Sequence, residues 1–282
     1  MGRLTYQQRL ARKLPRVMKF SRQWLRSIGR KPRGARLIFI VGAQRSGTRL
    51  PLQILEHAED IATFSEGAAP FFNDVFLRPF DQIEDLARRS PAPIIALKPI
   101  CETHRIHELL DRFPSSLAVW IFRNYEATAL SASRKWTAGK EALRRIARRE
   151  APGSDWRLGG LSEQKLQLVS RLYREDMSEY EAHAVMWYLR SSLYFDLQAN
   201  ERREVLLVRY EDLIAEPEDQ FRRLFSFVGQ PVPPGALATI RPSSRSKRSY
   251  PNLAEDIRAV CEQLQQRLIA HHDASKALVA AR

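Results

Sequence analysis

Several features that define other kinds of protein are scarce in this sequence of 282 residues. It has only two cysteines, Cys101 and Cys261, and their separation fits neither a disulfide framework nor a metal-binding pair. No apolar run approaches the ~20 residues that span a bilayer, and no signal-peptide core follows the basic N-terminus. These absences argue against a secreted, disulfide-rich protein and against a transmembrane protein, and they predict a cytoplasmic one.

Acidic residues are absent from the first 36 positions, which contain twelve Lys or Arg. The rest of the chain has 34 basic and 32 acidic residues, so the formal net charge of +14 is mainly a property of the N-terminal segment. A nucleic-acid-binding domain needs clustered cations on its folded surface, and the near-neutral remainder therefore predicts no nucleic-acid partner. We divide the chain into a basic segment, residues 1–35, and an α/β domain, residues 36–282.

The basic segment can form an amphipathic helix that begins at Pro15, a tolerated first-turn position. At about 100° per residue its apolar side chains share one face and its cations the other. The apolar face consists of Val17, Met18, Phe20, Trp24, Leu25 and Ile28. Such a helix suits the surface of an anionic membrane. Docking of the apolar face on the domain or on another subunit, and a cleaved organelle-targeting peptide, are the open alternatives.

The domain alternates short apolar runs with helical patterns. The runs are continuous, as expected of parallel strands buried on both faces, and they lie at 36–41, 61–65, 93–97, 117–122 and 204–209. The helical patterns cover Thr48–His57, Asp81–Arg89, Glu102–Arg112, Asn124–Trp136, residues 162–199, and a helix entered through Pro217. This order predicts an α/β, P-loop-like, three-layer fold with a central parallel sheet of about five strands flanked by helices. Ligands of such folds bind at the carboxyl ends of the strands.

The first strand runs into the loop "GAQRSGTRL", residues 42–50. Its Gly42-x4-Gly47 spacing matches the first half of a P-loop, whose backbone N–H groups cradle phosphate. The second half does not match, because Thr48 stands in place of the lysine and Arg49 in place of the magnesium-binding hydroxyl. The loop is therefore either a decayed nucleotide loop or a phosphate site that needs no magnesium.

A second strand ends in a cation where P-loop kinases commonly place a metal-binding aspartate. In "VWIFRNYEATALS" the strand ends at Arg123, and Ser131 follows eight residues later on the next helix. A guanidinium and a hydroxyl at these positions indicate that a second phosphate is bound directly, without a metal.

Together these stretches resemble the sulfotransferases that use 3′-phosphoadenosine 5′-phosphosulfate (PAPS), most closely the carbohydrate-type and bacterial branches. "VGAQRSGTRL" is similar to their 5′-phosphosulfate loop, "FRNYEATALS" to their 3′-phosphate motif, and "LLVRYEDLIAEPEDQF" to a later strand and helix. The resemblance spans roughly residues 36–250. It implies that Arg45, Ser46, Gly47 and Thr48 bind the 5′ end of PAPS and that Arg123 and Ser131 bind the 3′-phosphate.

The acceptor hydroxyl needs a general base, and the leaving phosphate oxygen needs positive charge. The resemblance implies Glu66 as the base, with Lys98 and Arg45 stabilising the developing charge. Glu66 could instead be a helix-capping or salt-bridged carboxylate. The small-molecule branch carries a histidine two residues past the lysine, where this chain has Ile100, and His104 and His107 are weaker candidates for the base.

Three further stretches have assignments of lower rank. In "RPSSRSKRSY" a solvated basic loop is the ordinary interpretation, and the resemblance implies that Arg245, Lys247 and Arg248 contribute to the 3′-phosphate site. Residues 151–160, "APGSDWRLGG", predict a surface loop that could cover the site. The aromatic helix with Trp187 and Tyr188 should be mostly core, with one edge lining the acceptor pocket.

The sequence therefore predicts a sulfotransferase that moves a sulfonate group from PAPS to an acceptor hydroxyl of a carbohydrate or glycolipid, without a metal. A P-loop nucleotide kinase or NTPase is the first alternative. A non-catalytic, membrane-associated nucleotide-binding module is the second. Protein tyrosine stays open as an acceptor, and so does the oligomeric state.

Overall fold

The computed structural model of the chain describes residues 18–26, 34–238, 240 and 249–280. Its centre is a sheet of five parallel strands in the order β2-β5-β1-β6-β7. The strands are β1 (Arg36–Gly42), β2 (Ile61–Ser65), β5 (Ile94–Lys98), β6 (Leu117–Phe122) and β7 (Val205–Arg209). The predicted α/β class and the five parallel strands are confirmed, including the run at 61–65.

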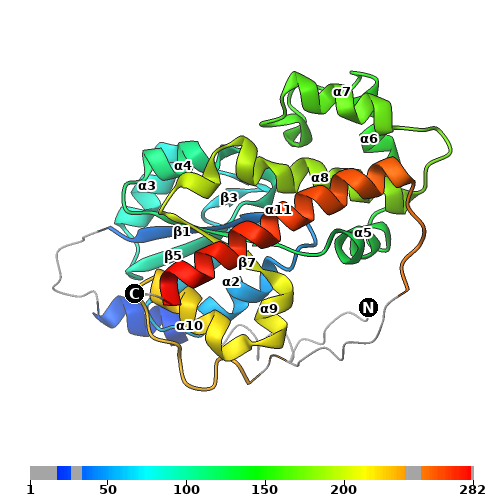
Figure 1. The fold of residues 1–282 in the computed structure, drawn as a ribbon. Helices are drawn as coiled ribbons and strands as arrows, with labels where there is room; N and C mark the ends of the chain where they lie inside the picture. Colours follow the sequence, from blue (N-terminus) through cyan, green and yellow to red (C-terminus); the bar gives the residue numbers. More distant parts are fainter. Residues whose placement is uncertain (1–17, 27–33, 239, 241–248, 281–282) are drawn as a thin grey trace, which may run out of the picture.

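Helices cover both faces of this sheet, which gives three layers (Figure 1). One face carries α3 (Phe80–Arg88), α4 (Ile106–Arg112), α5 (Tyr125–Ser133), α8 (Glu179–Asp196) and α11 (Glu255–Ala280). The other face carries α2 (Arg49–Leu55), α9 (Tyr210–Ala215) and α10 (Pro217–Phe227). The smaller elements are β3 (Phe72–Asn73), β4 (Phe76–Leu77), η1 (Ile100–Arg105), α6 (Gly139–Ala147), η2 (Trp156–Leu158), α7 (Glu163–Leu172) and η3 (Ala199–Glu201).

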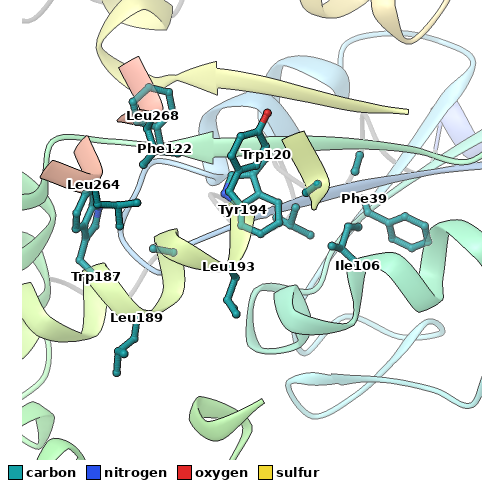
Figure 2. Packing of buried hydrophobic residues seen from close by; sticks show 14 of the residues in the cluster. Phe39, Ile106, Trp120, Phe122, Trp187, Leu189, Leu193, Tyr194, Leu264 and Leu268 are labelled. Atoms are coloured by element: carbon teal, nitrogen blue, oxygen red, sulfur yellow. The ribbon is translucent and has the colours of Figure 1, made fainter. Parts of the chain in front are cut away.

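The continuous apolar runs are explained by the two cores. In β1 the side chains of Leu37, Phe39 and Val41 pack into one core, and those of Ile38 and Ile40 pack into the other. Every second residue of a strand points to the same face, so a strand buried on both sides must be apolar throughout. The first core is rich in aromatic side chains that lie between the sheet and α8 (Figure 2).

Several predicted helix boundaries are wrong. The pattern at 162–199 forms two helices, α7 and α8, because Tyr173 leaves the helical region with φ −71° and ψ 134°. Ser178 then caps α8 and forms a capping box with Glu181, a signal that is visible in the sequence. The pattern at 102–112 begins earlier, as the 3-10 helix η1 at Ile100. The α6 and α11 helices and the β3–β4 hairpin were not predicted.

Residues 18–26 of the basic segment are helical and lie against the loop between α2 and β2. The Lys19 ammonium donates to the carbonyl oxygens of Glu56 at 2.6 Å and Ile61 at 2.5 Å, and Arg22 pairs with Glu59 at 3.1 Å. These contacts come from the polar face of the helix. On its apolar face, Met18, Phe20, Trp24 and Leu25 are each at least half exposed.

Candidate active site

The predicted site residues meet at one edge of the sheet, where the parallel strands end. Gly42 ends β1, Lys98 ends β5, Glu66 follows β2, Arg123 follows β6, and Tyr210 follows β7. The chain fills the β2–β5 side of β1 first and the β6–β7 side afterwards. Its direction of travel therefore reverses beside β1, and this switch point is where open α/β sheets form a ligand crevice.

The loop after β1 has room for glycine alone at two positions. Gly42 has φ +135°, and a Cβ there would lie 2.2 Å from the carbonyl oxygen of Ile121. Gly47 has φ +87°, and a Cβ would lie 2.0 Å from the ring of Tyr210. Only glycine allows both the positive φ and this close approach of the loop backbone to its neighbours. A phosphate-cradling turn needs such an exposed run of backbone N–H groups.

Two polar atoms beside the loop are buried and have no hydrogen-bond partner in the described part of the chain. They are the hydroxyl oxygen of Ser46, a fully buried residue, and Nε of Arg123. Buried donors are almost always satisfied, so such atoms call for an explanation. Thr48, buried at the start of α2, also makes no side-chain capping bond. An oxyanion held in the loop would satisfy these groups.

The two predicted phosphate motifs touch each other. Arg45 Nε donates to the Ser131 hydroxyl at 3.1 Å, and Arg123 Nη1 donates to the Arg45 carbonyl oxygen at 3.3 Å. The Arg123 guanidinium lies 4.6 Å from the ring centroid of Tyr210, and the Arg123 carbonyl accepts from Trp187 Nε1 at 3.0 Å. Residues 45, 46, 47, 48, 123 and 131 thus form one cluster. Arg245, Lys247 and Arg248 lie outside the described residues.

Glu66 and Lys98 form an ion pair, with 20 % and 12 % of their side chains exposed. The other oxygen of Glu66 accepts from the backbone N–H of Ile100 at 3.1 Å. The carboxylate is thus held in a fixed orientation at the crevice. Glu66 is salt-bridged, which was one of the two interpretations of the sequence. Its partner Lys98 is itself a predicted catalytic residue, so the ion pair is compatible with Glu66 as the general base.

The two histidine candidates differ in their surroundings. His104 lies half-buried beside Gly159, where a Cβ would be 2.4 Å from the imidazole ring. Burial and the nearby Arg190 charge lower the pKa of His104 to about 4, so the ring is neutral at physiological pH. His107 is exposed. Neither side chain is hydrogen-bonded to Glu66 or Lys98 in the described structure.

A buried residue that sequence reasoning missed supports the loop. The Thr103 hydroxyl in η1 accepts from the backbone N–H of Gly42 at 3.3 Å and lies within donating distance of the Gly42 carbonyl oxygen, at 3.1 Å. Thr103 thereby ties the start of the phosphate loop to the segment that follows Lys98. No sequence pattern marks this threonine, because its role depends on the contact between β1 and η1.

A cavity of about 290 Å³ opens beside the loop. Residues 43 and 44 of the loop line it, together with side chains from α5, α6, η2 and α8 and the residues around them. The lining consists of Ala43, Gln44, Thr128, Ala132, Trp136, Ala138, Gly139, Ala142, Trp156, Arg157, His183, Met186, Trp187 and Arg190. Trp156 and Arg157 belong to the 151–160 loop, so this loop does border the site. Trp187 lines the cavity from α8, the aromatic helix.

Within the described residues, no group of three or more His, Cys, Asp or Glu is arranged to hold a metal ion. None of the helices in the same part of the chain is both long and apolar enough to cross a bilayer.

This combination defines an α/β protein whose phosphate-type loop has no Walker lysine and faces an arginine instead of a metal-binding carboxylate. The family model of the sulfotransferase domain matches residues 36–250 of the sequence. The chain therefore belongs to the sulfotransferase family. No match was found among curated protein sequences.

Solved structures of sulfotransferases are similar to the chain at low identity. A sulfotransferase from Alicyclobacillus acidocaldarius is 18% identical, with 84% of this chain and 94% of that chain covered and a TM-score of 0.42. A mouse sulfotransferase complexed with PAP is 13% identical, with 94% of each chain covered and a TM-score of 0.40. One from Mycobacterium avium is 14% identical, with 95% and 85% covered and a TM-score of 0.43.

Proposed function

We propose that the protein transfers the sulfonate group of PAPS to an acceptor hydroxyl and releases 3′-phosphoadenosine 5′-phosphate (PAP). The observation that carries this proposal is the contact between the two phosphate motifs, in which Arg45 bonds Ser131 and Arg123 bonds the Arg45 carbonyl. A cluster of two guanidiniums and a hydroxyl suits a nucleotide with phosphates at both the 5′ and the 3′ positions. Membership of the sulfotransferase family supports the same reaction.

In this proposal the 5′-phosphosulfate lies in the glycine loop. Its oxygens would accept from the backbone N–H groups of the loop and from the buried Ser46 hydroxyl, which has no other partner among the described residues. The 3′-phosphate would take the free Nε of Arg123 and the Ser131 hydroxyl. Arg45 and Thr48 complete the donor set, so no metal is needed to neutralise the phosphates.

Glu66 acts as the general base. It removes the proton of the acceptor hydroxyl as the hydroxyl oxygen attacks sulfur, and the bond from sulfur to the 5′-phosphate oxygen breaks. Lys98 and Arg45 stabilise the negative charge on the sulfonate and on the departing phosphate oxygen. The ion pair of Glu66 with Lys98 keeps both groups at the crevice until the substrates bind.

We propose a carbohydrate or glycolipid acceptor, and we place the enzyme in the cytoplasm at the surface of an anionic membrane. The exposed apolar side chains of the helix at 18–26 support the membrane contact, because Met18, Phe20 and Leu25 are 50%, 56% and 62% exposed. An apolar face directed away from the domain can enter the headgroup region, while nearby cations attract anionic lipid.

The kinase alternative is disfavoured because Thr48 stands in place of the Walker lysine and Arg123 in place of the metal-binding carboxylate. The non-catalytic alternative is disfavoured because Glu66 and Lys98 are both present and held in contact at the crevice.

Calorimetry with EDTA present tests the donor. PAP and AMP differ only in the 3′-phosphate, and PAP should bind about 10- to 150-fold more tightly, the equivalent of roughly 1.5–3 kcal/mol for hydrogen bonds to a charged group. Arg123→Gln should remove this preference. Arg134→Gln, which alters an exposed arginine at the end of α5, is the control. Equal affinities for PAP and AMP, or tight ADP binding that requires magnesium, would favour the kinase.

A further inference from the structure

The cavity beside the phosphate loop is connected to the predicted catalytic pair through Gln44 and Cys101. Gln44 lines the cavity, and its side-chain amide is 3.9 Å from the Cys101 sulfur. Burial raises the pKa of the Cys101 thiol to about 12, and the Glu66 charge contributes to this shift. Cys101 directly follows Ile100, whose backbone N–H binds the Glu66 carboxylate at 3.1 Å. Two consecutive residues therefore connect the lining of the cavity with Glu66.

The cavity also contains a buried cation. Arg190 lies on α8, lines the cavity, and is 2% exposed. Its Nη1 makes one long hydrogen bond, 3.4 Å to the carbonyl oxygen of Trp156, and its Cζ lies 5.2 Å from the centroid of the Trp156 ring. Its Nη2 has no hydrogen-bond partner among the residues that the structure describes.

No carboxylate in the described structure forms an ion pair with Arg190. Asp155, whose charge acts on Arg190, is already paired with Arg157 at 3.0 Å. Burial lowers the pKa of the Arg190 guanidinium to about 10, so the side chain is still charged at neutral pH. A buried charge without a partner is costly, and most such charges in proteins are paired. A negatively charged ligand in the cavity would supply the missing partner of Arg190.

We propose that this cavity binds the acceptor, that Arg190 binds a carboxylate of the acceptor, and that the acceptor is a ring-bearing hydroxy acid. This inference rests on the proposed sulfonate transfer. One uncompensated guanidinium matches a single negative charge, which favours a carboxylate over a doubly charged phosphate. Trp136, Trp156 and Trp187 supply flat apolar surfaces on which a ring can pack.

The size of the cavity limits the acceptor. A volume of about 290 Å³ corresponds to roughly ten water molecules at ~30 Å³ each, enough for one ring with its substituents. A hexuronic acid unit and a phenolic acid both fit this description. Within the proposed carbohydrate acceptors, the inference selects acidic sugars over neutral ones.

Binding of matched probe pairs to the PAP-loaded protein tests the proposal without any sulfonate transfer. The pairs are 4-nitrophenyl glucuronide with 4-nitrophenyl glucoside, and 4-hydroxyphenylacetate with its amide. By calorimetry, the acid of at least one pair should bind tenfold or more tightly than its neutral partner, and the pair that responds tells a sugar acid from a phenolic acid. Equal binding within both pairs, or no binding of any probe at millimolar concentration, would overturn the proposal.

Variants then assign the preference to Arg190. Arg190→Gln should reduce the acid preference at least tenfold, and Arg190→Lys should retain part of it. Arg145→Gln, which removes an exposed cation from the nearby α6, should leave the preference within twofold. Each variant is first shown to bind PAP as the wild type does. A folded Arg190→Gln protein with an undiminished acid preference would refute the assignment, and the wild-type comparison stands even if this variant does not fold.

Transfer from PAPS to the preferred acid is measured separately. An acid preference without sulfonate transfer would retain the carboxylate site and overturn the proposed function. Transfer to neutral hydroxyls alone would retain the proposed function and overturn the carboxylate site.

Discussion

The two halves of the candidate site are built in different ways. The donor half consists of short contiguous stretches, the 42–48 loop and the Arg123–Ser131 turn, which meet because β1 and β6 are neighbours in the sheet. The proposed acceptor half is a cavity lined from four separate elements, α5, α6, η2 and α8, each of which contributes a few side chains. In the proposed function the donor half binds PAPS through the backbone geometry of its loop, whereas the acceptor half is formed by tertiary packing of side chains.

Glu66 provides the strongest test of this division, because it lies at the donor edge but is proposed to act on the acceptor. Glu66→Gln retains the hydrogen bond from the Ile100 N–H and the size of the side chain but cannot take up a proton. We expect unchanged PAP binding and a turnover lowered about 10²- to 10⁴-fold, the usual contribution of a positioned base. Steady-state kinetics with PAPS and calorimetry with PAP measure the two effects.

The control for this variant is Glu84→Gln, which removes an exposed carboxylate paired with Arg112 and should leave turnover unchanged. Near-normal turnover of the Glu66 variant would make Glu66 structural, and His104 would then be the next candidate for the base.

The same division explains how much the sequence could predict. Local sequence patterns are enough to predict the roles of Gly42, Gly47 and Arg123 and the positions of the buried strands. Glycine spacing and continuous apolar runs can be recognised from neighbouring residues alone. The structure brings these predicted donor residues together. The calorimetric comparison of PAP with AMP tests whether they bind the nucleotide.

The acceptor half could not be predicted in this way. Arg190 lies in a mostly apolar helix pattern, and only tertiary packing shows that it is buried without a carboxylate partner. The sequence patterns also did not predict α11, which is helical over residues 255–280. The helix at 18–26 has the predicted amphipathic pattern, but it docks through its polar face because the loop at 56–61 offers carbonyl oxygens and acids to its cations.

Backbone geometry in the donor half gives the second prediction. Gly47→Ala would place a Cβ 2.0 Å from the Tyr210 ring at a backbone φ of +87°. Strained backbone positions cost of order 1–3 kcal/mol, and PAP affinity should fall about 100-fold as the loop moves. Calorimetry of PAP binding measures the effect.

The matched control is Gly235→Ala, which has φ +72° but no heavy atom within 4 Å of the added Cβ. It carries a similar backbone strain without the clash and should bind PAP normally. Equal losses in both variants would show that strain alone is responsible, and the close approach of Gly47 to Tyr210 would then not matter to the site.

The third prediction concerns a support of the donor half that acts on stability. Asp212, in α9, accepts from His272 at 3.0 Å and from Lys276 at 2.9 Å, and so connects α11 to α9. These contacts hold the pKa of the Asp212 carboxyl well below its usual range. Asp212→Asn should lower the free energy of unfolding at pH 7 by about 2 kcal/mol, the scale of a hydrogen bond to a charged group.

The pH dependence of this effect has a definite sign. Because the folded-state pKa of Asp212 is depressed, its contribution is complete above the unfolded value near 3.9 and is lost as the pH falls toward the folded value. The gap between wild type and variant in urea denaturation should narrow from pH 5 to pH 3. Asp219→Asn breaks an exposed pair with Arg222 and should change stability by less than about 0.5 kcal/mol. A gap that does not depend on pH would assign the stabilisation to packing and not to charge.

The smallest effect is expected at the helix of residues 18–26, which belongs to neither half of the site. Phe20 and Leu25 are 56% and 62% exposed, so replacing both with serine should leave the fold intact. If this face enters a bilayer, the double variant should bind vesicles containing phosphatidylserine about tenfold more weakly than wild type, since apolar burial contributes part of the binding. Wild-type binding should also weaken with added salt, because cations near an anionic surface contribute about 1 kcal/mol each within a Debye length. Co-sedimentation with anionic and with neutral vesicles measures both effects, and a chain beginning at Arg36 serves as the reference. If the wild type, the double variant and the shortened chain sediment alike, the helix is a docking element of the domain, and the argument for a glycolipid acceptor loses its support while the argument for a carboxylate in the cavity is unaffected.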